Sequence, residues 1–194
     1  MTPAAVEVLG ALSGVLSRFG PWYLFGAQAV IAYGVPRLSA DVDVTLRLAE
    51  EATEAFVEAM RAAGFEVRLS DPELVRRASV LPFVHGPTGM PLDVVLAGSG
   101  LEDEFLNRAR SIEIEGIHVP TIDPADLVIA KVLAGRAKDI EDARGLWKIH
   151  GAHIDEARIR SILHLRHPRE SGSAMTGCPD PTQTGPAVGV ALAA

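Results

Sequence analysis

The chain has 194 residues, of which 48% are hydrophobic and 22% are charged, and its formal net charge is −7. These values predict one globular domain, or one domain with a small appendage, and they argue against a surface built as a whole to grip nucleic acid. The single cysteine, Cys178, excludes an internal disulfide and a cysteine-based zinc cluster, which fits a reducing cytoplasm. We expect no secretory signal, because no basic region precedes the N-terminal apolar run. We also expect no membrane span, because no apolar run approaches roughly 18–20 residues.

The charge is distributed unevenly along the chain. Residues 1–126 contain 9 Lys+Arg and 18 Asp+Glu, whereas residues 127–170 contain 9 Lys+Arg, 6 Asp+Glu and four of the six histidines. An acidic half that carries carboxylates and a mildly basic half could form the two walls of a cleft for a polyanion. The alternative is a chance asymmetry on solvated helices.

The first 70 residues alternate between helix and strand patterns. Apolar residues recur at helical spacing from Val6 to Leu16, and Gly20-Pro21 ends that helix. A short aromatic-rich run then predicts a strand, and Gly26 follows it directly. The predicted elements, in chain order, are a helix over 3–18, a strand over 22–25, a helix over 27–33, a strand over 41–47, a helix over 50–63 and a strand over 65–69.

The rest of the chain begins with strands and ends with helices. Two strand patterns flank Gly86-Pro87-Thr88-Gly89, which predicts a hairpin. Asp123-Pro124-Ala125-Asp126 has the pattern of a helix start, with an N-cap acid, proline at the first helical position and an acid at the third. The predicted elements are strands over 80–85 and 91–97, a helix over 101–108, strands over 111–115 and 117–120, and helices over 124–135, 138–150 and 154–166.

This order of elements predicts a mixed α/β (α+β) fold. We expect residues 1–122 to form a small mixed β-sheet with flanking helices, and residues 123–167 to form a helical part packed on it. Residues 168–194 are rich in Pro, Gly, Ser, Thr and Ala and show no apolar periodicity. That composition predicts a disordered tail without a catalytic role.

The pair Gly26-Ala27 lies between a predicted strand and a predicted helix. Glycine has no Cβ, so a phosphate could approach the backbone there, and a helix that follows would offer free N–H groups and the positive end of its dipole. The alternative is an ordinary strand–glycine–helix junction with no ligand.

Three aspartates form the second motif. Asp41 and Asp43 are two residues apart on a predicted strand, so both side chains point to the same face. Asp93 lies inside the apolar run of a later predicted strand, where aspartate is unusual. If the two strands are neighbours, three carboxylates converge and need a hard divalent cation to offset their repulsion. Alternatively, the pair marks a solvated strand end and Asp93 forms a salt bridge with a core arginine.

Taken together, these motifs resemble the nucleotidyltransferase superfamily that includes DNA polymerase β. Within it, the chain is similar to bacterial nucleotidyltransferases of the AbiEii toxin kind and their uncharacterised relatives. The family usually has Gly-Gly or Gly-Ser where this chain has Gly26-Ala27, so a serine hydroxyl that could bind a phosphate oxygen is missing here. The resemblance covers roughly residues 15–150, and its segments are Phe25 to Val30, Pro36 to Val44, Asp126 to Lys131 and Arg136 to Asp142.

The resemblance implies a nucleotidyltransferase-like core with a two-metal site. Asp41 and Asp43 would hold two Mg²⁺ ions, for which Mn²⁺ could substitute, and Asp93 would complete the site and accept the proton of the attacking hydroxyl. Gly26 and Ala27 would bind the β- and γ-phosphates of an NTP. In-line attack of the hydroxyl on the α-phosphate would release pyrophosphate.

Three cations are candidate nucleotide contacts: Arg37, Lys131 and Lys138. The two lysines are the cations of the helical part that match the family. Lys131 interrupts an apolar helical face, so it either reaches into a cleft or extends to solvent. Lys138 either offsets phosphate charge or is a solvated helix-start lysine, and Asp142, four residues later, could pair with it across one turn. Arg37 either orders the loop before Asp41 or contacts a phosphate.

The leading functional hypothesis is a Mg²⁺-dependent nucleotidyltransferase of a toxin–antitoxin kind. It would move a nucleotide from an NTP to a hydroxyl of tRNA or of a protein, with a cognate antitoxin as a candidate partner and no membrane partner. A second hypothesis is a small-molecule adenylyltransferase, because the acidic N-terminal half would suit a cationic, aminoglycoside-like antibiotic. A third is a non-catalytic module that binds a nucleotide or a partner, which the Ala27 departure motivates.

Overall fold

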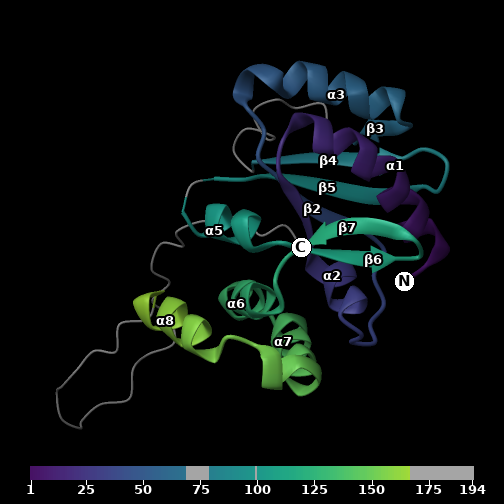
Figure 1. The fold of residues 1–194 in the computed structure, drawn as a ribbon. Helices are drawn as coiled ribbons and strands as arrows, with labels where there is room; N and C mark the ends of the chain where they lie inside the picture. The colour runs from purple at the N-terminus through teal and green to yellow at the C-terminus, as the bar shows by residue number, and fades with distance from the viewer. Residues whose placement is uncertain (69–78, 99, 167–194) are drawn as a thin grey trace, which may run out of the picture.

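The protein folds around a seven-stranded mixed β-sheet (Figure 1). The computed structural model describes residues 1–68, 79–98 and 100–166. The strand order is β3-β4-β5-β2-β1-β7-β6; β2 pairs in parallel with β5 and β1 with β7, and the other neighbours are antiparallel. The strands are β1 (Trp22–Phe25), β2 (Val42–Leu46), β3 (Phe65–Val67), β4 (Val80–His85), β5 (Met90–Leu96), β6 (Arg110–Ile114) and β7 (Ile117–Thr121).

Helices pack around this sheet. Figure 1 shows α1 and α3 in the upper part of the view, and α6, α7 and α8 gathered in the lower part. The helices are α1 (Pro3–Phe19), α2 (Gly26–Ala32), α3 (Thr53–Ala62), α5 (Leu101–Arg108), α6 (Pro124–Ala134), α7 (Ala137–His150) and α8 (Glu156–Arg166), with 3₁₀ turns at Glu50–Ala52 and Gly151–His153. Within the described residues, no helix combines the length and the apolar character that crossing a membrane requires.

The mixed α+β fold expected from the sequence is confirmed. The strands predicted over 22–25 and 80–85 and the helix predicted over 101–108 have their predicted bounds. The helix predicted over 50–63 begins with a 3₁₀ turn before α3, a frequent arrangement at helix N-termini. The tail predicted over 168–194 lies outside the described residues.

Helix α1 is capped at its N-terminus and packs one apolar stripe against the core, as its sequence pattern predicts. The Thr2 hydroxyl accepts a hydrogen bond from the backbone N–H of Ala5, and Pro3 occupies the first turn, where its missing N–H is no loss. One stripe of the helix is buried against the core and contributes roughly 1.5–3 kcal/mol for each fully buried large side chain. That stripe comprises Ala5, Val8, Leu9, Leu12, Val15 and Leu16.

Helix α6 begins as the sequence predicts and ends at a glycine. The Asp123 carboxylate accepts a hydrogen bond of 2.8 Å from the N–H of Ala125, and Pro124 is the first helical residue. Gly135 ends the helix in the left-handed region, at φ 68°, and its N–H donates to the carbonyl of Lys131. A residue with a side chain is strained in that conformation, so glycine suits this end of the helix.

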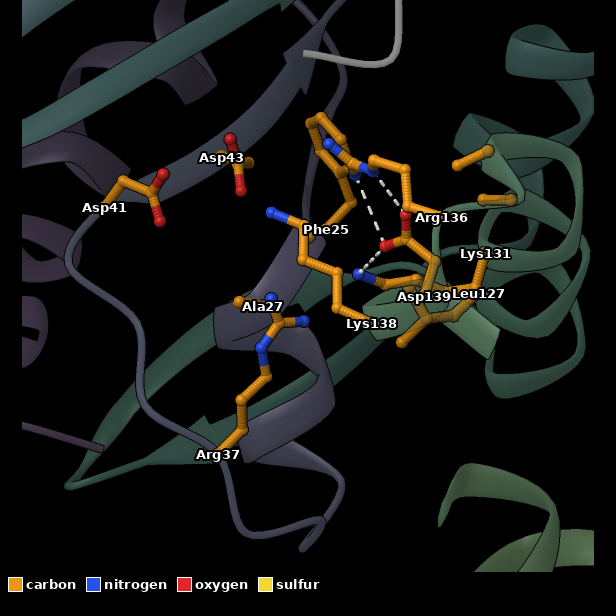
Figure 2. Close-up of a pocket in the computed structure, with 13 residues that line it drawn as sticks. Phe25, Ala27, Arg37, Asp41, Asp43, Leu127, Lys131, Arg136, Lys138 and Asp139 are labelled. Atoms are coloured by element: carbon orange, nitrogen blue, oxygen red, sulfur yellow. Dashed lines mark hydrogen bonds and ion pairs between the residues drawn. The ribbon is translucent and has the colours of Figure 1, made fainter. Parts of the chain in front are cut away.

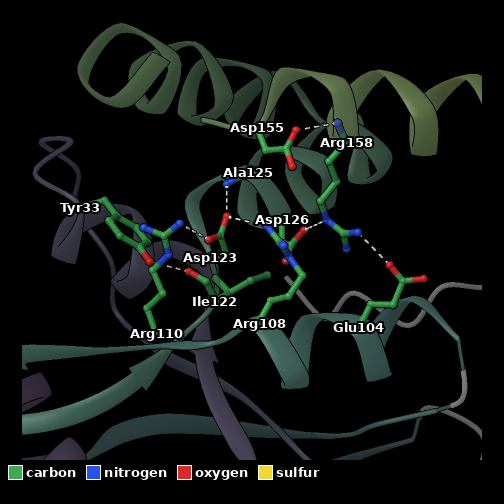
Figure 3. Close-up of polar contacts among 10 residues, drawn as sticks. All are labelled: Tyr33, Glu104, Arg108, Arg110, Ile122, Asp123, Ala125, Asp126, Asp155 and Arg158. Carbon is green, nitrogen blue, oxygen red and sulfur yellow. Dashed lines mark hydrogen bonds and ion pairs between the residues drawn. The ribbon is translucent and has the colours of Figure 1, made fainter. Parts of the chain in front are cut away.

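Asp126, the third residue of α6, is fully buried and joins three helices (Figure 3). Its Oδ2 accepts a hydrogen bond of 2.9 Å from Arg108 Nε of α5, and its Oδ1 accepts one of 2.6 Å from Arg158 Nε of α8. Arg158 also donates to Glu104, at 2.9 Å. Burial raises the pKa of Asp126, and the hydrogen bonds from Arg158 and Arg108 oppose that rise. These contacts fix the helical part of the chain against α5.

Candidate active site

Strand pairing brings two of the predicted aspartates side by side. Asp43 on β2 is directly opposite Asp93 on the parallel strand β5, and it is opposite Phe25 on the antiparallel strand β1. Residues in register on neighbouring strands share a face of the sheet. The neighbouring strands that the sequence argument required are therefore present. Asp41 lies one residue before β2 begins.

The glycine after β1 is required by its contact with Asp43. Gly26 has φ +63°, and a Cβ placed on it would overlap the Asp43 carboxylate. A side chain at this position would therefore be strained in its backbone and would collide with the site. The following helix, α2, has only seven residues, so its dipole is short. Phosphate binding at Gly26 and Ala27, which stays a prediction, would depend mainly on the cations around them.

Two polar side chains that the sequence argument missed hold the backbone and carboxylate of Asp41. Gln28 of α2 donates a hydrogen bond of 2.9 Å to the Asp41 carbonyl. Ser39 donates to the same carbonyl at 3.1 Å and to Asp41 Oδ1 at 2.7 Å. Both residues lie in the segments that carried the resemblance, but neither has the charge that marks a candidate ligand. Their role follows only from the folded loop.

Asp43 is a buried carboxylate with an uncompensated oxygen. Its side chain is nearly inaccessible, and its Oδ1 has no hydrogen-bond partner among the described residues. Burial raises the pKa of Asp43 to about 7; the negative charges of Asp41 and Asp93 add to the rise, and Lys131 and Arg136 oppose it. A buried anion without a partner is costly, so this carboxylate suits a site that takes up a cation.

A pocket opens in front of Asp41 and Asp43 (Figure 2). One wall is the β1–α2 turn with Phe25 to Ala27, and the opposite wall is formed by α6 and α7. The structure brings all five predicted nucleotide-binding residues to this pocket, together with one further cation. They are Gly26, Ala27, Arg37, Lys131 and Lys138, and the further cation is Arg136.

Lys131 reaches into the protein and does not extend to solvent. Its Nζ lies 3.0 Å from Asp139 Oδ1 and 2.8 Å from Asp142 Oδ2, and only 8% of the side chain is exposed. Arg136 also donates to Asp139. Burial would raise the pKa of Asp139, but the hydrogen bonds from Arg136 and Lys131 outweigh it and hold that pKa below its usual value. Lys131, Arg136, Asp139 and Asp142 therefore form a charge cluster held together by ion pairs within the protein.

In the structure Arg37 orders the loop before Asp41, one of its two alternatives, whereas Lys138 does not form the pair with Asp142. Arg37 donates to the Asp142 carboxylate, so it ties the loop before Asp41 to α7. Asp142 is consequently paired with Arg37 and Lys131, and within the described chain it forms no ion pair with Lys138. Lys138 is exposed, and its amino end points into the pocket (Figure 2). Lys138 can therefore contact an added phosphate without first leaving a carboxylate of α7, unlike Arg37 and Lys131.

Asp93 lies in register with Asp43, but its carboxylate is turned toward Arg68. Arg68 Nη2 donates to Asp93 Oδ1, and 36% of the arginine side chain and 22% of the aspartate side chain are exposed. Asp93 does not line the pocket, and across residues 1–68, 79–98 and 100–166 no three His, Cys, Asp or Glu side chains are already gathered as a metal cage. Asp93 thus forms a salt bridge, as the alternative held, but with an exposed arginine and not with a core one. Its role as a third metal ligand stays a prediction that requires release from Arg68.

Arg136 and Asp139 are two further site residues that the sequence argument missed, besides Gln28 and Ser39. They lie in the segment Arg136 to Asp142, which carried part of the resemblance, but only Lys138 was selected from it. A usable signal was present, because Asp139 and Asp142 are three residues apart and so share a face of the predicted helix. Two acids on one face near Lys131 indicate a charge cluster.

Comparison with known proteins agrees with this architecture. A family model described as a nucleotidyltransferase of unknown function (DUF6036) matches residues 22–150. The comparison with curated proteins found no match. The matched segment contains the β1–α2 turn, all three aspartates and the charge cluster of α6 and α7.

Solved structures with the same fold include antibiotic adenylyltransferases. ANT(2″)-Ia in complex with adenylyl-2″-tobramycin is 18% identical, with a TM-score of 0.56 over 86% of this chain and 99% of that chain. The lincosamide antibiotic adenylyltransferase LnuA, lincomycin-bound, is 14% identical, with a TM-score of 0.51 over 77% and 98%. An antigenic nucleotidyltransferase-like protein from Paracoccidioides brasiliensis is 15% identical, with a TM-score of 0.53 over 85% and 88%.

At these identities the solved structures establish the fold alone, whereas the family match extends over about two thirds of the chain and over the whole pocket. The chain therefore belongs to the DUF6036 family of nucleotidyltransferases and is a transferase.

Proposed function

We propose that this protein is a Mg²⁺-dependent enzyme that transfers a nucleotide from an NTP to a hydroxyl of a macromolecular acceptor, RNA or protein. The observation that carries the proposal is Asp43. It is a buried carboxylate with an oxygen that has no partner among the described residues and a pKa raised to about 7, beside Asp41 and in register with Asp93. Such a group gains most from a bound cation, and oxygen donors suit Mg²⁺ or Mn²⁺.

In this proposal the aspartates divide the chemistry. Asp41 and Asp43 hold the metal, with Asp41 oriented by Ser39 and Gln28. Bound divalent ions would neutralise triphosphate charge and lower the pKa of the acceptor hydroxyl. Asp93, on the neighbouring strand, takes the proton from the acceptor hydroxyl. The oxygen of that hydroxyl forms the new bond to the α-phosphorus, and pyrophosphate leaves.

The opposite wall of the pocket supplies the positive charge for the phosphates. Lys138 and Arg136 are exposed at its rim, and Lys131 and Arg37 are held within hydrogen-bond reach of the carboxylates of α7. Ordered cations bind a polyanion with little loss of side-chain freedom. The negative carboxylate wall and the positive helical wall together suit a metal–triphosphate complex, which carries both kinds of charge.

The AbiEii-type resemblance favours a toxin-like role within this reaction. It supports tRNA or a protein as the acceptor, and a cognate antitoxin as a partner. A second candidate is a small-molecule adenylyltransferase. The observations that favour it are the acidic N-terminal half of the chain and the fold shared with ANT(2″)-Ia and LnuA.

Two measurements test the proposal. The first is calorimetric titration with Mg²⁺–NTP before and after the double substitution Asp41→Asn with Asp43→Asn, which should abolish binding. Equal binding by both proteins would refute the metal-site assignment. The second is incubation with labelled NTPs and either total RNA, total protein or an antibiotic panel. Label in RNA or protein supports the macromolecular acceptor, and label in an antibiotic supports the second candidate.

A further inference from the structure

The sheet carries a straight row of residues that extends beyond the pocket. Arg68 follows β3, and its N–H donates to the carbonyl of Pro82 on β4 at 2.9 Å. Pro82 is in register with Asp93, Asp93 with Asp43, and Asp43 with Phe25. The row therefore runs from Arg68, one residue past the end of β3, across β4, β5 and β2 to Phe25, the last residue of β1 before the β1–α2 turn.

The two ends of this row have different partners. The end at Phe25 and Gly26 adjoins the pocket lined by Arg37, Lys131 and Lys138, whereas Asp93 does not line that pocket. The Arg68 side chain extends past Pro82, which it neighbours on the adjacent strand, and donates to Asp93. Asp93 thus lies between Arg68 and the rest of the carboxylate site.

The geometry of the reaction assigns a role to the Arg68 end. In an in-line displacement the attacking oxygen and the leaving pyrophosphate are on opposite sides of the α-phosphorus. If the phosphates occupy the end with Gly26 and the pocket cations, the acceptor hydroxyl must approach from the Asp93 end. The first charged side chain beyond Asp93 on that side, along the row, is Arg68.

We infer that Arg68 is a specificity-determining residue. It selects an RNA strand as the acceptor, because RNA carries phosphates, and it disfavours a polycationic acceptor. The inference rests on the proposed transfer reaction and names its acceptor class. Arg68 is a planar guanidinium, which binds phosphate oxygens through paired hydrogen bonds. It is 36% exposed, so an acceptor can reach it. When Asp93 turns toward the acceptor hydroxyl or a metal, its Oδ1 no longer holds Arg68, and the guanidinium is released to contact a phosphate.

The same charge works against the other acceptor class. An aminoglycoside carries several ammonium groups, and a guanidinium released beside the general base repels them. A site built for such a ligand would place acids there. Arg68 therefore separates the two candidate functions by charge at a single position.

The chain offers a matched control for testing Arg68. Arg47, which follows the far end of β2, forms the same kind of pair with Asp103, and the two side chains are 43% and 41% exposed. Both ion pairs join an arginine that follows a strand to a partly exposed aspartate. Arg47→Ala thus removes a comparable ion pair at the far end of that strand, whereas Arg68→Ala removes the one beside Asp93.

The test measures binding of a fluorescent single-stranded oligoribonucleotide by anisotropy over a range of salt concentrations. Arg68→Ala should weaken binding about fivefold to tenfold and reduce the slope of log K against log salt by about 0.7, the loss of one phosphate contact. Arg68→Lys should retain most of the affinity because it keeps the charge. Arg47→Ala should bind RNA as the unaltered protein does, and calorimetric titration should show that it leaves Mg²⁺–NTP affinity unchanged.

A second arm addresses acceptor choice, with tobramycin as the polycationic probe. Arg68→Glu should bind tobramycin more tightly than the unaltered protein. The inference is overturned if the unaltered protein does not bind RNA, if Arg68→Ala binds RNA undiminished, or if Arg47→Ala loses as much. It is also overturned if labelled nucleotide enters tobramycin or a protein independently of Arg68. RNA binding that depends on Arg68 without any transfer of label would refute the proposed reaction and leave the anion-selecting role of Arg68 standing.

Discussion

Two buried aspartates of this protein lie in opposite electrostatic surroundings. Asp126 is fully buried, and both of its carboxylate oxygens accept hydrogen bonds from arginines, Arg108 and Arg158. Asp43 is almost as deeply buried, but its Oδ1 has no hydrogen-bond partner in the described part of the chain, and Asp41 and Asp93 add negative charge nearby. Burial raises the pKa of both carboxyl groups, but in the described chain Asp126 has arginine partners on both oxygens and Asp43 has one oxygen without a partner.

The difference separates a stabilising contact from a binding site. A charge matched on both oxygens gains nothing from a ligand, and removing it leaves its partners unpaired. A charge left unmatched destabilises the free protein and is stabilised when a cation arrives. Perturbed carboxylates of the second kind are the ones that mark functional sites.

The largest effect should follow from Asp43→Asn. It removes a metal-binding charge, so nucleotide transfer should fall about 10³-fold, equivalent to roughly 4 kcal/mol of transition-state stabilisation. The free energy of unfolding at pH 8 should not fall, because an unpaired buried anion is also removed. Labelled-NTP transfer and urea titration measure the two quantities. Activity within tenfold of the unaltered protein would contradict the role of Asp43.

The pH dependence of the free energy of unfolding should differ between the unaltered protein and Asp43→Asn. The Asp43 carboxyl has a pKa of about 7 in the folded protein and 3.8 when unperturbed, so between these values the folded state binds the extra proton. The free energy of unfolding of the metal-free protein should therefore fall as pH rises from about 4 to about 7, by up to about 4 kcal/mol relative to Asp43→Asn. Below about pH 4 the Asp43 carboxyl is protonated in both the folded and the unfolded state, so it no longer makes the free energy of unfolding depend on pH. Urea titrations of both proteins across this range measure it, and parallel curves would contradict the shift.

Substitution of Asp126, which is paired with two arginines, should instead lower the stability of the protein. Asp126→Asn removes the charge that Arg108 and Arg158 share, and the free energy of unfolding should fall by about 2 kcal/mol, somewhat less than for a fully buried pair because both arginines are partly exposed. Mg²⁺–NTP affinity of the folded protein should change little. Asp103→Asn, which breaks the exposed pair with Arg47, serves as the control and should cost less than about 1 kcal/mol. Equal losses of unfolding free energy in Asp126→Asn and Asp103→Asn would show that the buried ion pairs of Asp126 stabilise the protein no more than an exposed pair does.

The smallest effect should come from the turn beside Asp43. Ala27→Ser introduces a hydroxyl at the position where the resemblance predicts glycine or serine, and it should tighten Mg²⁺–NTP binding about twofold to fivefold through one added hydrogen bond to phosphate. Ala27→Gly supplies no hydroxyl and should show no such gain. Calorimetric titration of the three proteins measures the change. Weaker binding by the serine variant would place the phosphates elsewhere in the pocket.

Much of this protein followed from local patterns in the sequence. Helical spacing located α1, and the run Asp123 to Asp126 located the start of α6, because capping and amphipathic packing act within one or two turns of chain. The alternation of β2 placed Asp43 on a defined face of the sheet. The aspartates at 41, 43 and 93 and the turn at Gly26 were therefore identifiable as one candidate site before the fold was known.

The tertiary structure decided which charges are compensated. Asp126 has the position of a capping acid but binds Arg108 and Arg158, and Asp142 pairs with Arg37, 105 residues away, and not with Lys138 one turn before it. Asp93, expected beside the metals, is held by Arg68 from two strands away. An ion pair forms wherever long side chains can reach, and that reach is set by strand order and helix packing. Sequence spacing therefore placed the carboxylates, and the folded chain determined their counter-ions.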